Sequence, residues 1–356
     1  MREWKKRAKI WGDVVAFDYV KSKVALESPL IYVWDIDKTY LDTHFESLRG
    51  LWRTALEKAF QKRNVPGANL LVKALNRAHR DASDKPFPIY FISASPPQME
   101  RKIREKLALD GITPLGTFFK DNLKNLKPSR WWRLSHHLGY KLQALLELRT
   151  QLKADVKQIL WGDDSESDAV IYAMYSDICS RRLAGGDLVK ILHALRVVGE
   201  QIETIFELVD QIPVQDPVGK IYINLAADTD PDYYLKFGRR MVVTSNSFQA
   251  ALDLYQDGRL NDDEVLSIGQ DLLTNYGYTP DELAASLDAL VRRQVLGHAA
   301  VEKLLPLFHE NRLVPAAHRS PPALMKLIQD ESGFKRLADV QERWIPEYID
   351  YLRESR

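Results

Sequence analysis

Two groups of aspartates stand directly after apolar runs of the chain. Asp35 and Asp37 follow the run IYVW, and Asp163 and Asp168 follow QILW and Gly162. If both runs are strands of one sheet, their acidic ends converge and repel each other unless a cation lies between them. Hard oxygen ligands of this kind favour Mg²⁺. The alternative is that Asp simply favours turns and helix caps, which explains either group alone equally well.

Two further segments could complete a phosphate-binding site. The run FISAS ends in Ser93 and Ser95, whose hydroxyl and backbone N–H groups could hold a phosphate oxygen. A serine before Pro96 is also an ordinary start of a helix. Lys141 lies on a segment with helical spacing, where a single lysine is usually solvated. Neither segment predicts a site without the aspartates.

The elements that position these residues alternate along the chain. The candidate strands are short, rich in β-branched and aromatic residues, and bounded by charged residues, Gly or Pro, as in buried parallel sheets. Long segments with helical spacing lie between them, and this alternation predicts a Rossmann-like, doubly wound α/β sheet. Ligands bind at the carboxyl ends of such strands. The strands are expected at 31–34, 88–93, 157–161 and 220–225, and the helices at 47–62, 97–109 and 138–153.

The composition of the chain changes along its length and predicts three parts. Residues 1–29 are expected to form a basic, helical extension. Residues 30–245 carry the strand signals, with a helical insertion at about 180–218. Strand signals stop near residue 246, so 246–356 is expected to be an all-helical module.

Two helix starts stand out in that C-terminal module. Thr279, Pro280 and Glu282 have the order of a capping box with a first-turn proline. Ser320-Pro321 predicts another helix start. Residues 253–264 come close to a calcium-binding EF-hand loop, but Tyr255 replaces a ligand at its third position. We favour a helix end followed by a new helix cap at this segment.

Charge and length exclude several classes of protein. The 356 residues include 50 Lys and Arg against 49 Asp and Glu, so no global charge attracts nucleic acid. The single cysteine, Cys179, excludes an internal disulfide framework and fits a reducing compartment. No apolar run approaches the roughly 18 residues of a membrane span. Asp13 and Asp18 interrupt any signal-peptide core after the basic N-terminus, so we expect a cytoplasmic protein.

The ordered set DIDKT, FISAS, Lys141 and GDDSESD resembles the four motifs of the haloacid dehalogenase superfamily. Within it, the chain is similar to phosphatidate phosphatases of the yeast actin-patch-protein type and their bacterial relatives. The supporting stretches are LWRTALEKAF (51–60), VPGANLLVKAL (65–75) and GITPLGTFFKDN (111–122). The resemblance covers roughly residues 30–175, and it implies a phosphatase with a haloacid-dehalogenase-like fold.

The resemblance implies a role for each aspartate. Asp35 would attack phosphorus and form an aspartyl-phosphate, and Asp37 would act as general acid and base. Asp35, the backbone carbonyl of Asp37, and Asp163 would hold Mg²⁺. Asp168 would orient Lys141 or support the metal from outside its ligands. No organic cofactor is implied.

The remaining motif residues would bind the transferred phosphoryl group. Ser93 and Lys141 would hold its oxygens, with Ser95 as the alternative to Ser93. The chain departs from the family at Tyr140, where a histidine usually precedes the lysine, and at Asp164, which replaces a small residue. These departures bear on substrate choice more than on the type of reaction.

The expected substrate is a phosphate monoester, with phosphatidate implied by the resemblance. Residues 120–141 carry six Lys or Arg against one Asp, together with Trp131 and Trp132, and could contact an anionic membrane. A solvated loop whose tryptophans pack inward explains the same composition. The alternatives for function are a phosphatase of nucleotides or phosphoproteins, and a binding protein that keeps the fold without turnover.

Overall fold

A computed structural model describes residues 3–20, 28–41, 64–121, 137–165 and 167–354. The chain divides into two compact units. The first comprises Met1–Arg63, Lys85–Ile221 and Tyr348–Arg356, and the second comprises Asn64–Asp84 and Tyr222–Glu347.

The fold is α/β, and its large sheet is mostly parallel, as the sequence predicts. Strand β3 pairs in parallel with β4 and β6, and β4 pairs in parallel with β5. The strand order is β1-β2-β5-β4-β3-β6-β7-β8, and the boundary between the units falls within β7. The strands are β1 (Lys9–Trp11), β2 (Val14–Asp18), β3 (Leu30–Asp35), β4 (Ile89–Ser93), β5 (Gly116–Lys120), β6 (Lys157–Asp163), β7 (Val218–Asn224) and β8 (Met241–Thr244).

The N-terminal segment differs from the helical extension expected for residues 1–29. Its described part holds one short 3₁₀ helix, η1 (Glu3–Lys6), followed by the strands β1 and β2. These two strands are antiparallel to each other, and β2 is antiparallel to β5. The run Val14–Phe17 is buried, because it covers the edge of the sheet beside β5. Burial of this apolar run outweighs the basic composition around it.

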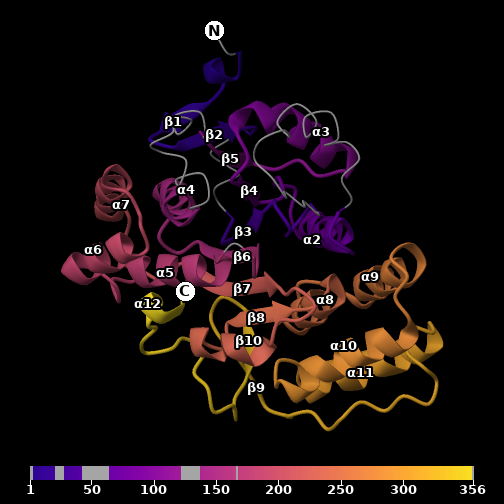
Figure 1. Ribbon diagram of the computed structural model, residues 1–356. Helices are drawn as coiled ribbons and strands as arrows, with labels where there is room; N and C mark the ends of the chain where they lie inside the picture. Colours follow the sequence, from indigo (N-terminus) through magenta and orange to yellow (C-terminus); the bar gives the residue numbers. More distant parts are fainter. Residues whose placement is uncertain (1–2, 21–27, 42–63, 122–136, 166, 355–356) are drawn as a thin grey trace. The chain divides into compact units, whose positions relative to one another are not determined.

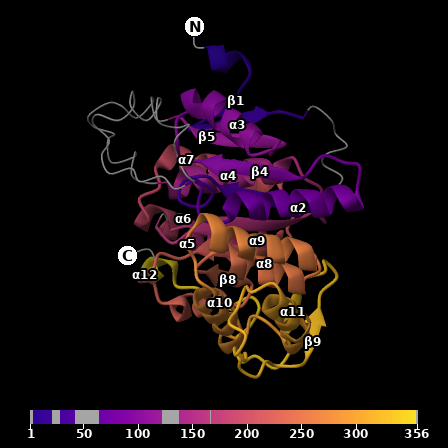
Figure 2. The same cartoon turned by 90° about the vertical axis from the view of Figure 1, so that its right-hand side faces the viewer.

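Helices of the first unit lie on both sides of its strands. In Figures 1 and 2, α4 lies on one side and α3 on the other, as in a doubly wound sheet. Residues 180–218 contain α6 and α7, and the helix expected at 47–62 lies outside the described residues. The helices are η4 (Pro97–Met99), α3 (Glu100–Leu109), α4 (Leu138–Thr150), α5 (Asp168–Cys179), α6 (Gly185–Ala194), α7 (Gly199–Gln211) and α12 (Tyr351–Glu354).

An aromatic pair sets the register of the central strands. Trp34 of β3 lies opposite Trp161 of β6, and their rings stack with centroids 4.6 Å apart. A slip of either strand by one residue would turn its tryptophan to the other face of the sheet and break the stack. The stacked pair therefore fixes Asp35, the next residue of β3, beside the Gly162–Asp163 end of β6.

The second unit is mainly helical, and two of the helix caps that the sequence predicts, Asn261 and Thr279, are present. Thr279 and Glu282 form a reciprocal capping box at α10, as expected. The helix predicted after Ser320 is wrong: residues 320–326 have no regular structure, and the Ser320 hydroxyl donates to Asp288 Oδ1. An antiparallel pair, β9 with β10, was not expected. The elements are α2 (Ala68–Ala82), η7 (Pro231–Phe237), α8 (Ser247–Gln256), α9 (Asp262–Asn275), α10 (Pro280–Arg292), α11 (His298–Glu310), β9 (Leu327–Gln329) and β10 (Lys335–Leu337).

The segment 253–264 forms a helix end and a new helix cap. Helix α8 ends before Gly258, which has a φ of 73°, and Asn261 caps α9 in a capping box with Glu264. Asp253 accepts a 2.7 Å hydrogen bond from the Tyr222 hydroxyl, and Asp257 accepts one from the backbone N–H of Lys335. The acidic side chains of the EF-hand-like pattern thus serve packing contacts and the helix cap.

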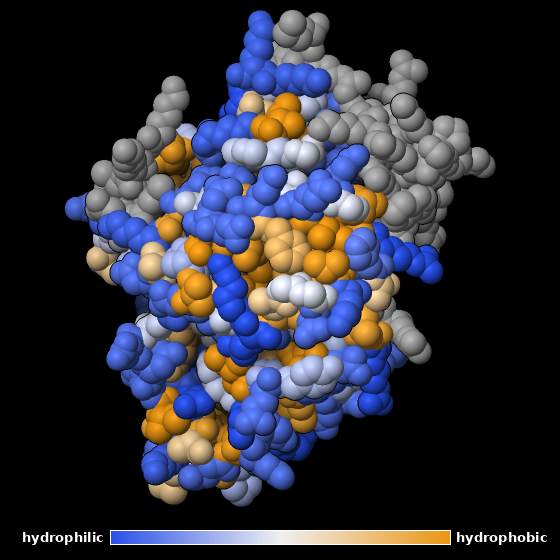
Figure 3. Space-filling model, turned by 90° about the vertical axis from the view of Figure 1, so that its left-hand side faces the viewer, coloured by the Kyte–Doolittle hydropathy of each residue, from blue (hydrophilic) through white to orange (hydrophobic). Residues whose placement is uncertain are grey.

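The surface carries both polar and apolar residues. Figure 3 shows one face on which hydrophilic residues predominate and apolar ones gather in separate patches. Among the residues described, no helix combines the length and apolar character that crossing a bilayer needs. Most of the basic stretch 120–141, including Trp131 and Trp132, lies outside the described residues.

Candidate active site

Four parallel strands end at the same edge of the sheet with a polar residue. Asp35, Ser93 and Asp163 are the last residues of β3, β4 and β6. Lys120 is the last residue of β5. Because these strands run in parallel, their carboxyl ends meet at one edge, which is where ligands bind in open α/β sheets. The sheet topology alone therefore brings chemically useful side chains together.

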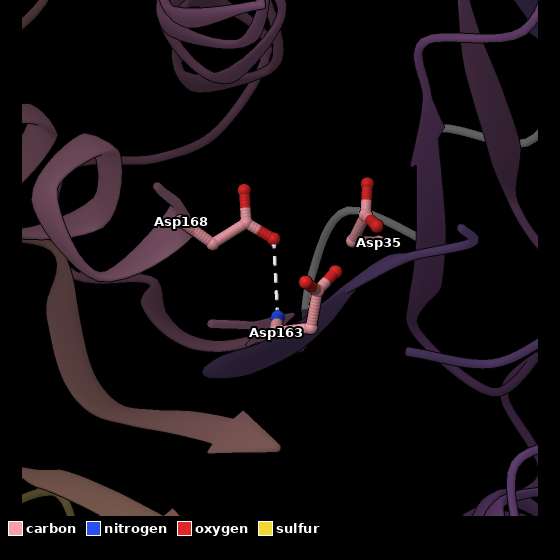
Figure 4. A group of neighbouring side chains, drawn as sticks. All are labelled: Asp35, Asp163 and Asp168. Atoms are coloured by element: carbon pink, nitrogen blue, oxygen red, sulfur yellow. Dashed lines mark hydrogen bonds between the residues drawn. The ribbon is translucent and has the colours of Figure 1, made fainter. Parts of the chain in front are cut away.

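Three buried carboxylates gather at this edge. Asp35, Asp163 and Asp168 each place one carboxylate oxygen within 4.8 Å of the other two. All three side chains are almost fully buried (Figure 4). Asp37 is buried as well, so four carboxylates share a small region of the protein interior. Burying several charges of one sign is costly unless cations neutralise them.

One of those cations is Lys141 of α4. Its Nζ lies 3.0 Å from Asp35 Oδ1 and 2.5 Å from Asp168 Oδ1, and the side chain is buried. Lys141 lies in the first turn of α4, and this end of the helix brings a lysine far along the chain to Asp35. Lys141 thus holds two of the carboxylates together.

Asp168 also contacts the end of β6. Its Oδ2 accepts a 3.2 Å hydrogen bond from the backbone N–H of Asp163, drawn in Figure 4. A Cβ atom on Gly162 would lie only 2.4 Å from that oxygen, so glycine is required for this close approach. Asp168 is the first residue of α5, where the helix dipole favours a negative charge.

Asp163 is oriented by the loop that follows it. The backbone N–H of Ser165 donates to Asp163 Oδ1 at 2.6 Å, and the Ser165 hydroxyl donates to the same oxygen. Thr39 Oγ1 lies 3.5 Å from the other oxygen, Oδ2. The two bonds from Ser165 fix one side of the carboxylate and thereby direct Oδ2 toward the site.

Ser93 connects Asp37 with α4. Its hydroxyl donates to Asp37 Oδ2 at 2.9 Å and accepts from the backbone N–H of Ser95 at 3.1 Å. The carbonyl of Ser93 accepts a 2.8 Å hydrogen bond from the Tyr140 hydroxyl. Burial raises the pKa of Tyr140 well above its usual value, and the charges of Asp35 and Asp37 raise it further against the opposing effect of Lys141. Tyr140 therefore stays protonated and keeps donating this bond.

The donor set fits a hard divalent cation. Asp168 already accepts hydrogen bonds from Lys141 and from the Asp163 N–H, so Asp35 and Asp163 are the carboxylates better suited to bind a metal ion directly. Lys141 supplies one positive charge against four buried carboxylates, and a divalent cation would offset much of the remainder. Carboxylate oxygens of this kind favour hard cations over softer metals.

The residues expected from the sequence lie together in the structure. This set comprises Asp35, Asp37, Ser93, Lys141, Asp163 and Asp168. Ser165 and Lys120 were not anticipated. Lys120 follows an apolar run, as Asp35 does. This position in the sequence could have identified it as a residue of the site. A hydrogen bond between neighbouring loop residues, such as that of Ser165, leaves no sequence signal of its own.

A comparison with protein families agrees with this geometry. The model of the family described as phosphatidate phosphatase APP1, catalytic domain, matches residues 30–183, from the start of β3 to just beyond α5. The match indicates that residues 30–183 form a phosphatase domain of a haloacid-dehalogenase-like family. The matched segment contains all six residues of the expected site and makes up less than half of the chain. No curated protein and no solved structure matches the chain.

Proposed function

We propose that this phosphatase hydrolyses phosphatidate with Mg²⁺, through a phosphorylated Asp35. The observation that supports the proposal most is the position of Asp35 at the end of β3, 3.0 Å from the ammonium of Lys141 and beside Asp163. A buried carboxylate that faces a cation keeps its negative charge and can act as a nucleophile.

The reaction proceeds in two displacements. A carboxylate oxygen of Asp35 attacks phosphorus, and the bond from phosphorus to the ester oxygen breaks. Asp37 donates a proton to that leaving oxygen, which departs as an alcohol. A water molecule then attacks the phosphorus of the aspartyl-phosphate, and Asp37 accepts its proton. Inorganic phosphate leaves, and the Asp35 carboxylate is restored.

Two side chains stabilise the charge that spreads over the phosphoryl oxygens. Lys141 supplies an ammonium. The Ser93 hydroxyl donates its single proton to Asp37 at 2.9 Å in the structure and would turn it to a phosphoryl oxygen when the substrate is bound. Asp168 keeps Lys141 aimed at Asp35 through its 2.5 Å contact. Asp35, Asp163 and the backbone carbonyl of Asp37 would hold Mg²⁺. When bound, the ion would offset the negative charge of the phosphate and of the carboxylates around it.

Phosphatidate is proposed as the substrate because of the family match. The basic composition of 120–141 supports contact with an anionic lipid surface, where each cation contributes roughly 1 kcal/mol. Changing Lys124, Lys127 and Arg130 to Ser should then weaken binding to vesicles that contain anionic lipid. Equal vesicle binding by this variant and the wild type would contradict the membrane contact and leave the chemistry untouched.

The chemistry is tested by phosphate release from a short-chain phosphatidate and an aryl phosphate, with and without Mg²⁺. Asp35→Asn is nearly isosteric and should remove turnover, while Asp187→Asn, at an exposed position, serves as the matched control. Asp163→Ala should weaken Mg²⁺ binding, measured by calorimetry as well as by activity. Wild-type turnover by Asp35→Asn would disprove the nucleophile. Hydrolysis of nucleotides or phosphopeptides in preference to both substrates would disprove the lipid assignment.

A further inference from the structure

A second buried lysine lies at the edge of the sheet that carries the site. Lys120 ends β5, and its backbone N–H donates to the carbonyl of Ser95 at 3.1 Å. Ser95 lies two residues beyond Ser93 at the end of β4. The side chain of Lys120 is 1% exposed, the same fraction as that of Lys141.

The strand register places Lys120 on the same face of the sheet as Asp35. Asp35 pairs with Ile92, and Ile92 pairs with Phe118. Paired residues share a face, and side chains alternate along a strand, so Lys120, two residues after Phe118, shares it too. Two strand spacings, about 10 Å, separate the backbones of β3 and β5. A lysine side chain is long enough to cover much of that distance.

His137 connects Lys120 with the phosphate-binding lysine. Lys120 Nζ lies 3.5 Å from His137 Nδ1. His137 immediately precedes α4, and its carbonyl accepts a hydrogen bond from the backbone N–H of Lys141. Side chains four residues apart lie on the same helix face, about 5–6 Å from each other. The pair Lys120–His137 thus lies about one helical turn from Lys141, which itself contacts Asp35.

We infer that Lys120 and His137 form a subsite for the alcohol part of the substrate and that this subsite binds an acyl-ester carbonyl oxygen. The inference rests on the proposed function and deepens it. With the phosphate at Asp35 and Lys141, the atoms a few bonds beyond the scissile oxygen lie about one helical turn away, roughly 5.4 Å. In a diacylglycerol phosphate, an ester carbonyl lies at that separation. An ammonium group in a buried site binds such an oxygen strongly.

The subsite predicts a preference that two substrates can measure. A short-chain diacylglycerol phosphate and its dialkyl ether analogue carry the same phosphate and differ in the carbonyl oxygens. The wild type, with Mg²⁺, should have the higher kcat/KM on the ester. Lys120→Met should reduce the ester-to-ether ratio of kcat/KM about 10-fold, the loss expected for one hydrogen bond to a charged group. Lys120→Arg should keep most of the preference.

The controls separate this role from a structural one. Lys190→Met removes an exposed lysine from α6 and should leave the ratio unchanged. If Lys120→Met does not fold, His137→Phe provides a second test, because it should also reduce the ester-to-ether ratio of kcat/KM. If Lys120→Met lost kcat/KM equally on the ester and the ether, or if the wild type did not prefer the ester, the proposed subsite would be wrong. Inactivity of the wild type on both lipid phosphates would remove the proposed function together with the subsite. An active wild type whose ratio survives in Lys120→Met removes the subsite alone.

Discussion

Gly162→Ala is the smallest substitution that should disturb the whole site. The added Cβ would lie 2.4 Å from Asp168 Oδ2, 2.5 Å from Asp168 Cβ and 2.8 Å from Asp168 Cγ. Ordinary contacts of a Cβ begin at 3.4 Å, so the Asp168 side chain has to move by about 1 Å. Asp168 belongs to the first turn of α5, and its backbone cannot follow without moving the helix.

The size of the effect follows from the bonds that such a shift breaks. Asp168 would lose its 2.5 Å contact with Lys141 and its 3.2 Å bond from the Asp163 N–H. Overpacking of a buried position costs roughly 1–3 kcal/mol of folding stability. A displacement of about 1 Å among groups that position a substrate costs on the order of 100-fold in rate. We therefore expect a modest loss of stability and a much larger loss of kcat/KM.

The assay compares Gly162→Ala with two matched variants, Gly186→Ala and Gly199→Ala. A Cβ at either control position meets nothing within 4 Å, and both glycines lie at helix starts in the first unit. Phosphate release and denaturant unfolding should be near wild type for both controls. If Gly162→Ala turned over phosphatidate as fast as the controls, Asp168 would not position Lys141, and the reasoning from the site geometry would fail.

Three further predictions concern other parts of the chain. Ser165→Ala removes one of two bonds to Asp163 Oδ1 and should raise the Mg²⁺ concentration needed for half-maximal binding about fivefold, measured by calorimetry; an unchanged titration would contradict this. Burial raises the pKa of the Cys179 thiol to about 12, so the native protein should resist alkylation at pH 8 until it unfolds, and rapid labelling would refute its burial. Thr279→Ala should lower the free energy of unfolding, measured with denaturant, by about 1 kcal/mol, because the α10 capping box is lost. Its phosphatase kinetics should equal those of the wild type, and slower turnover would contradict the assignment of the site to the first unit.

The sequence predicts the central strands and the acidic strand ends because those signals are local. The run IYVW and the aspartates after it are adjacent in the chain, and a parallel sheet brings such ends together wherever its strands lie. Strand β5 was missed because GTFFK is short and includes glycine and lysine. Lys120 was missed for the same reason, although it is the last residue of β5 just as Asp35 is the last residue of β3.

Other features depend on contacts between distant parts of the chain. The basic N-terminus gives no sign that Val14–Phe17 pairs with β5. Ser320 has the sequence of a helix cap, yet it starts no helix and its hydroxyl donates to Asp288 of α10. A cap forms only where the following residues gain from being helical, and the segment after Ser320 has two prolines in succession.

Asp168 explains why the metal-binding and phosphate-binding halves of the site should behave as one unit. Its Oδ1 contacts the ammonium of Lys141, and its Oδ2 accepts from the backbone N–H of Asp163. The residue that would bind the phosphoryl group and the residue that would bind Mg²⁺ are thus held by a single carboxylate. Groups that share one partner show strongly non-additive effects when they are changed together. Gly162 has no side chain and so leaves room for that carboxylate beside β6. The close approach of Asp168 to β6 thereby determines the distance between the two halves of the site.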